Sequence, residues 1–133
     1  IHQLKRIHEN LDLRKRLWNR YMDGLKGLPV TLPKLSENKN EVHALHLFQI
    51  RVKESHRDQF LQAYPQEGIG VGVHYRALTD LKIYEQFLKP SQKFPVASQF
   101  GKETISLPLG TSMNEKDVDD VVYATKKLIH HLI

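Results

Sequence analysis

Residues 68–78 have the sequence GIGVGVHYRAL, and this stretch decides how the rest of the chain is interpreted. Three glycines alternate with isoleucine and valine, and alternation with a period of two is typical of a β-strand. Glycine at every second position leaves one face of that strand bare, so another element can approach it closely. The strand ends in His74, Tyr75 and Arg76, and α/β proteins tend to place ligands at the carboxyl ends of strands. These three residues are therefore candidate substrate-binding residues.

Periodic patterns on both sides of this stretch predict one long helix and two more strands. Apolar side chains recur at helical spacing over residues 1–25, and Pro29 closes the pattern. Residues 42–52 are apolar on both faces, which is typical of a central strand. Residues 104–109 form a further strand, which Pro108 confines to an edge or to its own end.

Two capping patterns predict where the remaining helices begin. Ser55 with Asp58 approximates a capping box at the start of a short helix, and Asn114 with Asp117 forms one at the start of the last helix. Residues 77–98 lack a clean period and are interpreted as loop and short helix. The order of elements predicts an α/β fold: a small domain with a three-stranded sheet, helices mainly on one face, and a long N-terminal helix.

The composition is that of one globular domain. A chain of 133 residues has the length of a single domain, and its hydrophobic and charged fractions of 40% and 26% are ordinary. No apolar run approaches the roughly 18 residues needed to cross a membrane, so we expect no membrane partner. Zero cysteines exclude disulfides and thiolate metal sites, and they fit a reducing cytoplasm.

The formal charge of +5 raises the question of an anionic partner. Seven of the 20 basic residues lie within the first 26 positions, along the predicted N-terminal helix. They either form a face that binds the phosphate groups of an anionic partner, or they form an ordinary solvated helix face, in which Glu9, Asp12 and Asp23 are interspersed. Aromatic residues do not alternate with the basic ones, as stacking on nucleic-acid bases requires, so we expect no nucleic-acid partner.

Eight histidines suggest a metal site, but their spacing argues against one. His43 and His46 lie three apart on a predicted strand and point to opposite faces, while the adjacent His130 and His131 diverge by about 100° on a helix. No serine lies in a G-x-S-x-G turn, as a common class of hydrolases requires. The glycines of residues 68–72 lie inside a strand, whereas a dinucleotide fingerprint needs them in a strand-to-helix turn. We therefore assign no metal ligand and no catalytic residue.

Four stretches carry a resemblance to a known family, in the same order along the chain. They are residues 2–29 (HQLKRIHENLDLRKRLWNRYMDGLKGLP), 68–78 (GIGVGVHYRAL), 94–110 (FPVASQFGKETISLPLG) and 111–129 (TSMNEKDVDDVVYATKKLI). Together they resemble the C-terminal small domain of the DegT/DnrJ/StrS sugar aminotransferases, which are pyridoxal-phosphate (PLP) enzymes of fold type I.

This resemblance implies a largely antiparallel sheet, a connecting helix over residues 1–30 and a small domain over residues 31–133. It implies that the intact enzyme uses PLP and acts in the cytoplasm on a keto-sugar nucleotide, with an amino acid as amino donor. In the family the Schiff-base lysine and most phosphate-binding residues lie upstream, in a large domain. We therefore expect this chain alone to bind no PLP and to be inactive. The implied partners are that large domain, the sugar nucleotide and further copies of the enzyme in a homo-oligomer.

The resemblance also bears on the His74-Tyr75-Arg76 segment. The corresponding segment of the family approaches the sugar-nucleotide cleft and continues as HYxPLH, whereas this chain has Ala77 and Thr79 in place of the proline and the second histidine. The residues themselves leave another interpretation open, in which His74 faces the core and forms local hydrogen bonds. The alternative function is a non-catalytic binding or scaffolding module that retains the small-domain fold.

Overall fold

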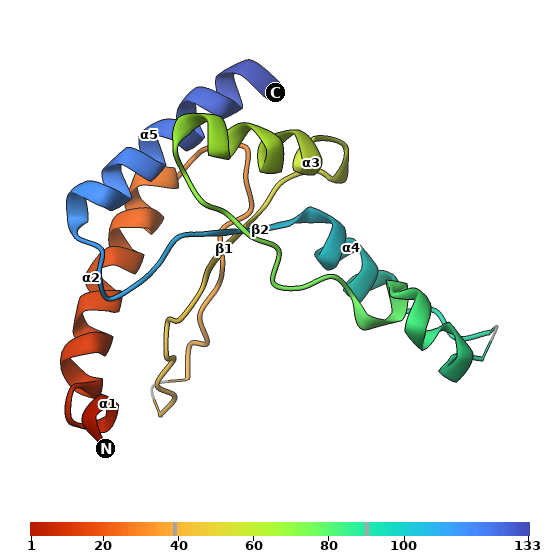
Figure 1. The fold of residues 1–133 in the computed structure, drawn as a ribbon, viewed down its shortest axis with the longest axis horizontal. Coiled ribbons are helices and arrows are strands. Elements are labelled where there is room, and N and C mark those ends of the chain that lie inside the picture. The colour runs from red at the N-terminus through yellow and green to blue at the C-terminus, as the bar shows by residue number, and fades with distance from the viewer. Residues whose placement is uncertain (39, 90) are drawn as a thin grey trace.

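The structure, a computed structural model, describes residues 1–38, 40–89 and 91–133 (Figure 1). Its α-helices are α1 (His2–Lys5), α2 (Ile7–Leu25), α3 (Glu54–Ala63), α4 (Pro95–Glu103) and α5 (Glu115–Leu132). Its strands are β1 (Phe48–Arg51) and β2 (Thr104–Leu107). Its 3₁₀ helices are η1 (Tyr64–Glu67), η2 (Leu78–Asp80) and η3 (Lys82–Phe87).

β1 and β2 form an antiparallel two-stranded sheet at the centre of the molecule (Figure 1). Side chains alternate between the two faces of a strand, so the register separates an apolar face from a polar face. The apolar face carries Phe48, Ile50, Ile105 and Leu107. The polar face carries Gln49, Arg51, Thr104 and Ser106.

The third strand predicted over the glycine-rich stretch is not confirmed. In this stretch, which is described throughout, Gly72 alone pairs with the sheet, through one antiparallel bridge to Ser106. Gly68 has a φ of 74° and ends η1, so the chain enters the stretch from a turn. Strand pairing depends on side-chain pairs across the strands, and glycine offers no side chain for them. A single bridge therefore lies where the alternation predicts a strand.

Other predicted boundaries are met in part. β1 covers residues 48–51 of the predicted 42–52, and Leu45, inside the predicted range, has a left-handed φ of 49° that interrupts the extended backbone before β1 begins. The N-terminal helix is interrupted at Arg6, which separates α1 from α2. The capping box predicted at Ser55 is wrong: the capping position is Lys53, two residues earlier, and α3 has no side-chain cap at its start.

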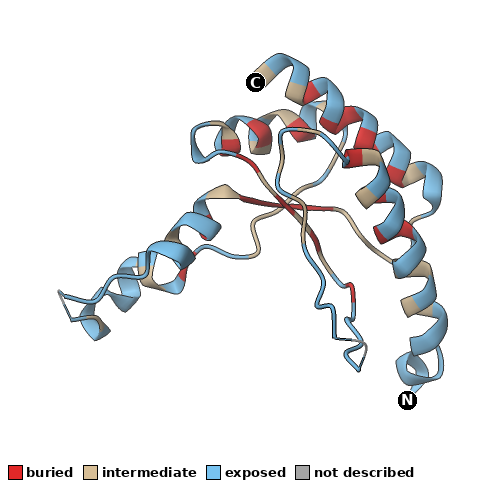
Figure 2. Cartoon of the chain, turned by 180° about the vertical axis from the view of Figure 1, so that it is seen from behind, coloured by how far each residue is buried: buried red, intermediate tan, exposed pale blue. Residues whose placement is uncertain are grey.

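α2, α3 and α5 cover the apolar face of the sheet, and buried residues concentrate there (Figure 2). The Phe48 ring stacks on Tyr21 with 4.6 Å between centroids, and it meets Trp18 edge-on at 4.8 Å. The Tyr21 hydroxyl donates to the carbonyl of Pro108 at 2.7 Å, which ties α2 to the chain leaving β2. Burying one such side chain stabilises the fold by about 1.5–3 kcal/mol, so this face carries most of the packing energy.

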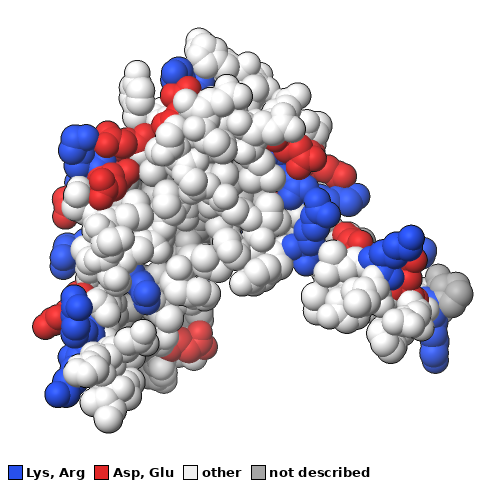
Figure 3. Space-filling view, viewed as in Figure 1, with Lys and Arg blue, Asp and Glu red and all other residues white. Residues whose placement is uncertain are grey.

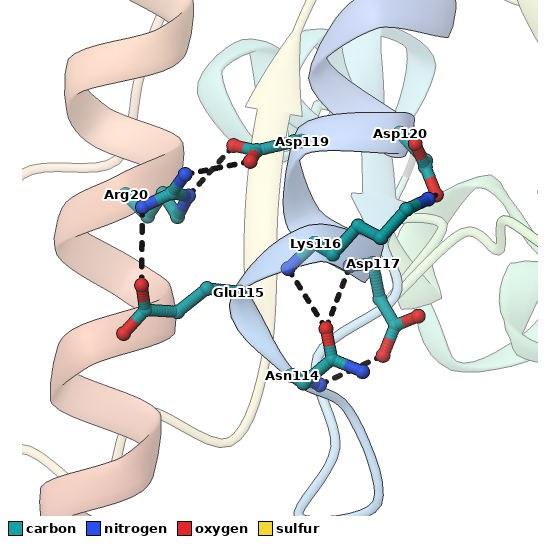
Figure 4. A network of polar contacts seen from close by, with 7 residues as sticks. All are labelled: Arg20, Asn114, Glu115, Lys116, Asp117, Asp119 and Asp120. Carbon is teal, nitrogen blue, oxygen red and sulfur yellow. Dashed lines mark hydrogen bonds and ion pairs between the residues drawn. The ribbon is translucent and has the colours of Figure 1, made fainter.

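The first and last long helices, α2 and α5, lie side by side (Figure 1). A Cβ added to Gly24 would lie 2.9 Å from the methyl groups of Val122, so glycine permits this close approach. On the exposed edge of the pair, the Arg20 guanidinium donates to both carboxylate oxygens of Asp119 at 2.6 Å and to Glu115 at 3.1 Å (Figure 4). One arginine therefore links the two helices through two carboxylates.

The capping box predicted at the start of α5 is confirmed (Figure 4). Asn114 Oδ1 accepts from the backbone N–H groups of Lys116 at 2.8 Å and of Asp117 at 3.2 Å. The Asp117 carboxylate accepts from the Asn114 N–H at 2.7 Å. All of these bonds join residues within three positions of one another, which explains why the sequence predicts this boundary.

The arm, which comprises η2, η3 and α4, extends away from the rest of the molecule (Figures 1 and 2). Its surface includes large apolar side chains that are well exposed: Leu78, Ile83, Tyr84, Phe87, Phe94, Val96 and Phe100. Lysine and arginine appear at its root and along its length (Figure 3). The arm therefore differs from the helices on the apolar face, whose large side chains are mostly buried.

Candidate functional site

His74, Tyr75 and Arg76 lie where the glycine-rich stretch leaves the sheet, two residues beyond the bridge at Gly72. Tyr75 is 73% exposed and Arg76 is exposed, whereas His74 is half-buried. The imidazole and phenol rings meet edge to face, with 5.0 Å between centroids and planes 83° apart, and the peptide bond between the two residues is cis. The segment thus presents a phenol and a guanidinium at the surface.

The imidazole of His74 folds back over the sheet. A Cβ added to Gly72 would lie 2.9 Å from the His74 Cε1 atom, so the ring occupies the space that a side chain at position 72 would fill. Gly72 in turn exchanges two backbone hydrogen bonds with Ser106, of 3.1 and 2.7 Å. The absence of a side chain at Gly72 therefore lets the ring lie close to the sheet.

Several buried polar atoms near this segment have no hydrogen-bond partner among the described residues. They include His74 Nδ1, Thr79 Oγ1, Thr104 Oγ1 and Ser106 Oγ. Thr104 and Ser106 are 0% and 4% exposed and belong to the polar face of the sheet. Buried polar atoms in folded proteins almost always have partners. The polar face thus retains donors and acceptors that no described residue uses.

A cavity of about 260 Å³ lies beside the polar face. Its lining includes Lys34, His46, Gln49, Arg51 and Phe100. The Arg51 guanidinium lies 5.2 Å from the centroid of the Phe100 ring and pairs with Glu103 at 3.3 Å. The cavity therefore combines cationic side chains with an aromatic wall, and the charge of Arg51 is already neutralised by Glu103.

A second hollow, of about 790 Å³, lies at the N-terminal helices and is lined by apolar side chains such as Ile1, Leu4, Ile7 and Val42. Arg14 interrupts this apolar lining, and its Nη1 donates to the carbonyl of Ala44 at 3.5 Å. The hollow is formed by different elements from the His74-Tyr75-Arg76 segment.

The tyrosines with shifted titration lie in the core rather than at this segment. Burial raises the pKa of Tyr64 to about 12, although a hydrogen bond with Thr125 acts in the opposite direction. The two hydroxyl oxygens are 2.9 Å apart, and that of Thr125 also donates to the Val121 carbonyl at 2.8 Å. Burial likewise raises the pKa of Tyr21. These phenols remain neutral and serve packing rather than proton transfer.

The described residues include no lysine whose surroundings suit the Schiff base of PLP. Every lysine in the described ranges is exposed, and some form ion pairs, such as Lys127 with Glu67 at 2.9 Å and Lys116 with Asp120 at 2.8 Å. A lysine that forms a Schiff base needs a site that desolvates its amine or lowers its pKa. No lysine of the described ranges has such surroundings.

Within the same described residues, histidine, aspartate and glutamate nowhere gather in threes as a metal ion would require. Across the ranges 1–38, 40–89 and 91–133, no helix combines the length and apolar character needed to cross a membrane.

Two further residues hold the His74-Tyr75-Arg76 segment in place. Gln49 Nε2, on the polar face of β1, donates to the carbonyl oxygen of His74. Gly101 of α4 lies against the backbone that follows, where an added Cβ would be 2.6 Å from the Ala77 nitrogen. Their signals are a polar residue between two apolar ones in a strand and a glycine inside a helix, but the sequence alone does not show what either contacts.

The fold and the placement of this segment can be compared with known proteins. The sequence model of the DegT/DnrJ/EryC1/StrS aminotransferase family matches residues 1–126. The chain belongs to this family. Aminotransferases of the family use PLP, and one relative has been solved in PLP, PMP and apo forms.

Three relatives show how far the likeness extends. The spore coat polysaccharide biosynthesis protein SpsC of Bacillus subtilis is 31% identical over 135 residues, which cover 97% of this chain and 34% of SpsC. Spr1654 of Streptococcus pneumoniae, described as a sugar aminotransferase, superimposes in its PLP form with a TM-score of 0.86 at 27% identity, covering 98% of this chain and 34% of that one. The aminotransferase TlmJ of Streptoalloteichus hindustanus superimposes with a TM-score of 0.87 at 23% identity and the same coverage, which shows the fold alone. The chain thus spans about a third of the length of these relatives.

Proposed function

We propose that this chain is the C-terminal small domain of a PLP-dependent aminotransferase that acts on a keto-sugar nucleotide, with an amino acid as amino donor. Residues 1–30 connect it to a large domain, residues 31–133 form the small domain, and the whole enzyme is a cytoplasmic homo-oligomer. Family membership supports the reaction class, and the sugar aminotransferase relatives support the substrate class.

The observation that carries the site assignment is the placement of Tyr75 and Arg76. Both side chains are exposed, although the backbone that presents them is bonded to the sheet through Gly72 and Gln49. Exposed polar side chains on a fixed backbone suit ligand contact, because little conformational entropy of the backbone is lost on binding. We place this segment at the cleft between the small and the large domain.

Each side chain of the segment has a distinct role in this proposal. Tyr75 offers a flat apolar ring to a sugar or base and one hydroxyl for a hydrogen bond. The Arg76 guanidinium has paired N–H donors that match a diphosphate. His74, whose ring packs over Gly72, positions the end of the glycine-rich stretch and takes no part in the chemical reaction.

The 133-residue chain alone does not transaminate in this proposal. PLP supplies the electron sink of transamination, and the lysine that carries it belongs to the large domain. Titrating the purified chain with PLP and recording the absorbance of a protein-bound imine tests this point. A stoichiometric band that disappears when one lysine is changed would contradict it.

The site assignment is tested in the whole enzyme that contains this chain. Arg76→Ala is expected to raise the KM for the sugar nucleotide about tenfold to hundredfold, because a charge-assisted hydrogen bond is worth about 1.5–3 kcal/mol. Tyr75→Phe is expected to raise it by roughly twofold to tenfold, through the loss of one neutral hydrogen bond. Arg16→Ala, at an exposed position on α2, is the matched control and should leave KM unchanged.

Two results would count against the proposal in different ways. If Tyr75→Phe and Arg76→Ala both leave turnover and KM unchanged, the site assignment is wrong while the family and fold stand. If the whole protein has no aminotransferase activity with any keto-sugar nucleotide, the alternative function, a binding or scaffolding module, replaces the enzyme.

A further inference from the structure

The backbone that presents Tyr75 and Arg76 is held from the side of the sheet by a side chain. Gln49 donates its amide to the carbonyl oxygen of His74, across 25 positions in the sequence. Gln49 lies opposite Ser106 in the register, and Ser106 bonds to Gly72. The side-chain bond therefore fixes the chain two residues beyond the point where backbone pairing with the sheet ends.

The same stretch of backbone is also in contact with α4, at the root of the arm. A Cβ added to Gly101 would lie 2.6 Å from the Ala77 nitrogen and 3.1 Å from the Arg76 Cα, so α4 touches this backbone directly. The position of Gly101 is itself fixed, because the buried Arg57 of α3 donates to its carbonyl at 3.3 Å. A side chain at position 101 would have to move either the arm or the Arg76–Ala77 backbone.

We infer that Gln49 and Gly101 are positioning residues, which together set where Tyr75 and Arg76 meet the sugar nucleotide. The inference rests on the proposed function, since it needs Tyr75 and Arg76 to contact that substrate. Neither residue has an assigned contact with the substrate, and each acts through the backbone of residues 74–77. Displacing this backbone weakens contacts made equally in the ground state and in the transition state, so KM rises while kcat stays nearly constant.

The experiment compares two variants of the whole enzyme with two matched controls. Gln49→Met keeps the length of the side chain but removes the donor, and Gln62→Met makes the same change at an exposed position on α3. Gly101→Ala adds a Cβ against the backbone, and Gly70→Ala adds one where nothing lies within 4 Å. KM and kcat are measured for the sugar nucleotide, together with inhibition by uridine diphosphate and thymidine diphosphate.

We expect Gln49→Met and Gly101→Ala each to raise KM and the inhibition constants roughly threefold to tenfold, the loss that corresponds to about one hydrogen bond. We expect kcat within about twofold of the unchanged enzyme, and no effect from Gln62→Met or Gly70→Ala. In an Arg76→Ala background, Gln49→Met should raise KM by a smaller factor than it does alone, because only the Tyr75 contact is left to displace and residues that act through one another are not additive. Hydrogen exchange at the amides of residues 74–77 should accelerate in both variants.

The outcomes separate this inference from the proposed function. If Arg76→Ala raises KM but Gln49→Met and Gly101→Ala do not, the positioning role is wrong and the proposed site stands. Faster exchange without a change in KM would also overturn the positioning role, since the contacts would then be purely structural. If Arg76→Ala and Tyr75→Phe themselves leave KM unchanged, the proposed substrate site is wrong, and the positioning role that rests on it is wrong as well. Should Gly101→Ala not fold, Gln49→Met still decides the question.

Discussion

The two faces of the β1–β2 sheet are built in opposite ways. On the apolar face, Phe48 and Ile50 are fully buried against α2, α3 and α5. On the polar face, Thr104 and Ser106 are almost as deeply buried, yet their hydroxyl groups have no hydrogen-bond partner among the described residues. Four-residue strands therefore separate an apolar core from a buried polar face whose hydroxyl groups have no partner among the described residues.

The difference shows that one side of this short sheet packs the core, while the other side holds the backbone from which Tyr75 and Arg76 project. The helices on the apolar face supply packing, whereas Gln49 on the polar face supplies a hydrogen bond to the backbone before Tyr75. Changes on the apolar face should therefore alter the free energy of unfolding. Changes on the polar face should alter how the exposed side chains are placed.

The largest effect on stability is expected from Phe48→Ala. The ring is fully buried between Trp18 and Tyr21, so its removal leaves a cavity and should lower the free energy of unfolding by about 3–5 kcal/mol. Urea-induced unfolding, followed by far-ultraviolet circular dichroism, measures this loss. A loss below about 1 kcal/mol would mean that the apolar face does not dominate the packing.

A smaller effect is expected from Tyr21→Phe. The change removes the donor to the Pro108 carbonyl and leaves that acceptor without its partner, which should cost about 1–3 kcal/mol. The matched control is Tyr123→Phe, because Tyr123 is 73% exposed on α5 and should change stability little. Equal unfolding midpoints for the two variants would contradict a role for the Tyr21 hydroxyl.

The ion pair between α2 and α5 predicts a modest dependence of stability on pH. The hydrogen bond from Arg20 lowers the pKa of Asp119 below its ordinary value of 3.8. A carboxylate with a lowered pKa in the folded state contributes stability above its unfolded pKa and loses it as pH falls through the folded pKa. Asp119→Asn should therefore be less stable than the unchanged chain at neutral pH, and the gap should close below about pH 3.8.

Unfolding curves between about pH 7 and pH 2 give this comparison, and added salt should narrow the gap at neutral pH because the pair is exposed. A gap that stays constant down to the lowest pH would show that the carboxylate charge is not the cause.

The smallest effect on stability is expected from Phe87→Ala in the arm. This is the same chemical change as Phe48→Ala, but the Phe87 side chain is 72% exposed. The free energy of unfolding of the 133-residue chain should therefore shift by no more than about 0.5 kcal/mol. Comparing the two phenylalanine variants under identical conditions is the sharpest test of the contrast between packed body and open arm.

The sequence predicts those parts of the fold whose causes are local. The Asn114 capping box depends on residues within three positions of one another, and it appears where the pattern places it. The glycine-rich stretch fails as a strand because its pairing depends on partners elsewhere in the chain, and only Gly72 finds one. The prediction at Ser55 fails because α3 begins at Glu54 with Lys53 at the capping position, so Ser55 lies inside the helix.

The residues of the candidate site also differ in whether a local sequence pattern points to them. The sequence proposes His74, Tyr75 and Arg76 from their position at the end of an alternating pattern, and in the structure Tyr75 and Arg76 are exposed while His74 is half-buried. The sequence does not propose Gln49 and Gly101, because each matters through a contact with a distant segment of backbone. The spacing of residues along the sequence does not show that the Gln49 side chain bonds to the carbonyl oxygen of His74, 25 positions away.

The link between Arg20 and Asp119 has a consequence for synthesis of the chain. The two residues are 99 positions apart, and a ribosome that adds about 5–20 residues per second needs roughly 5–20 s to cover that distance. During this interval the apolar side of α2, including Leu17 and Leu25, has emerged before the helix that covers it. The core that contains Leu17 and Leu25 therefore closes only after α5 has left the ribosome.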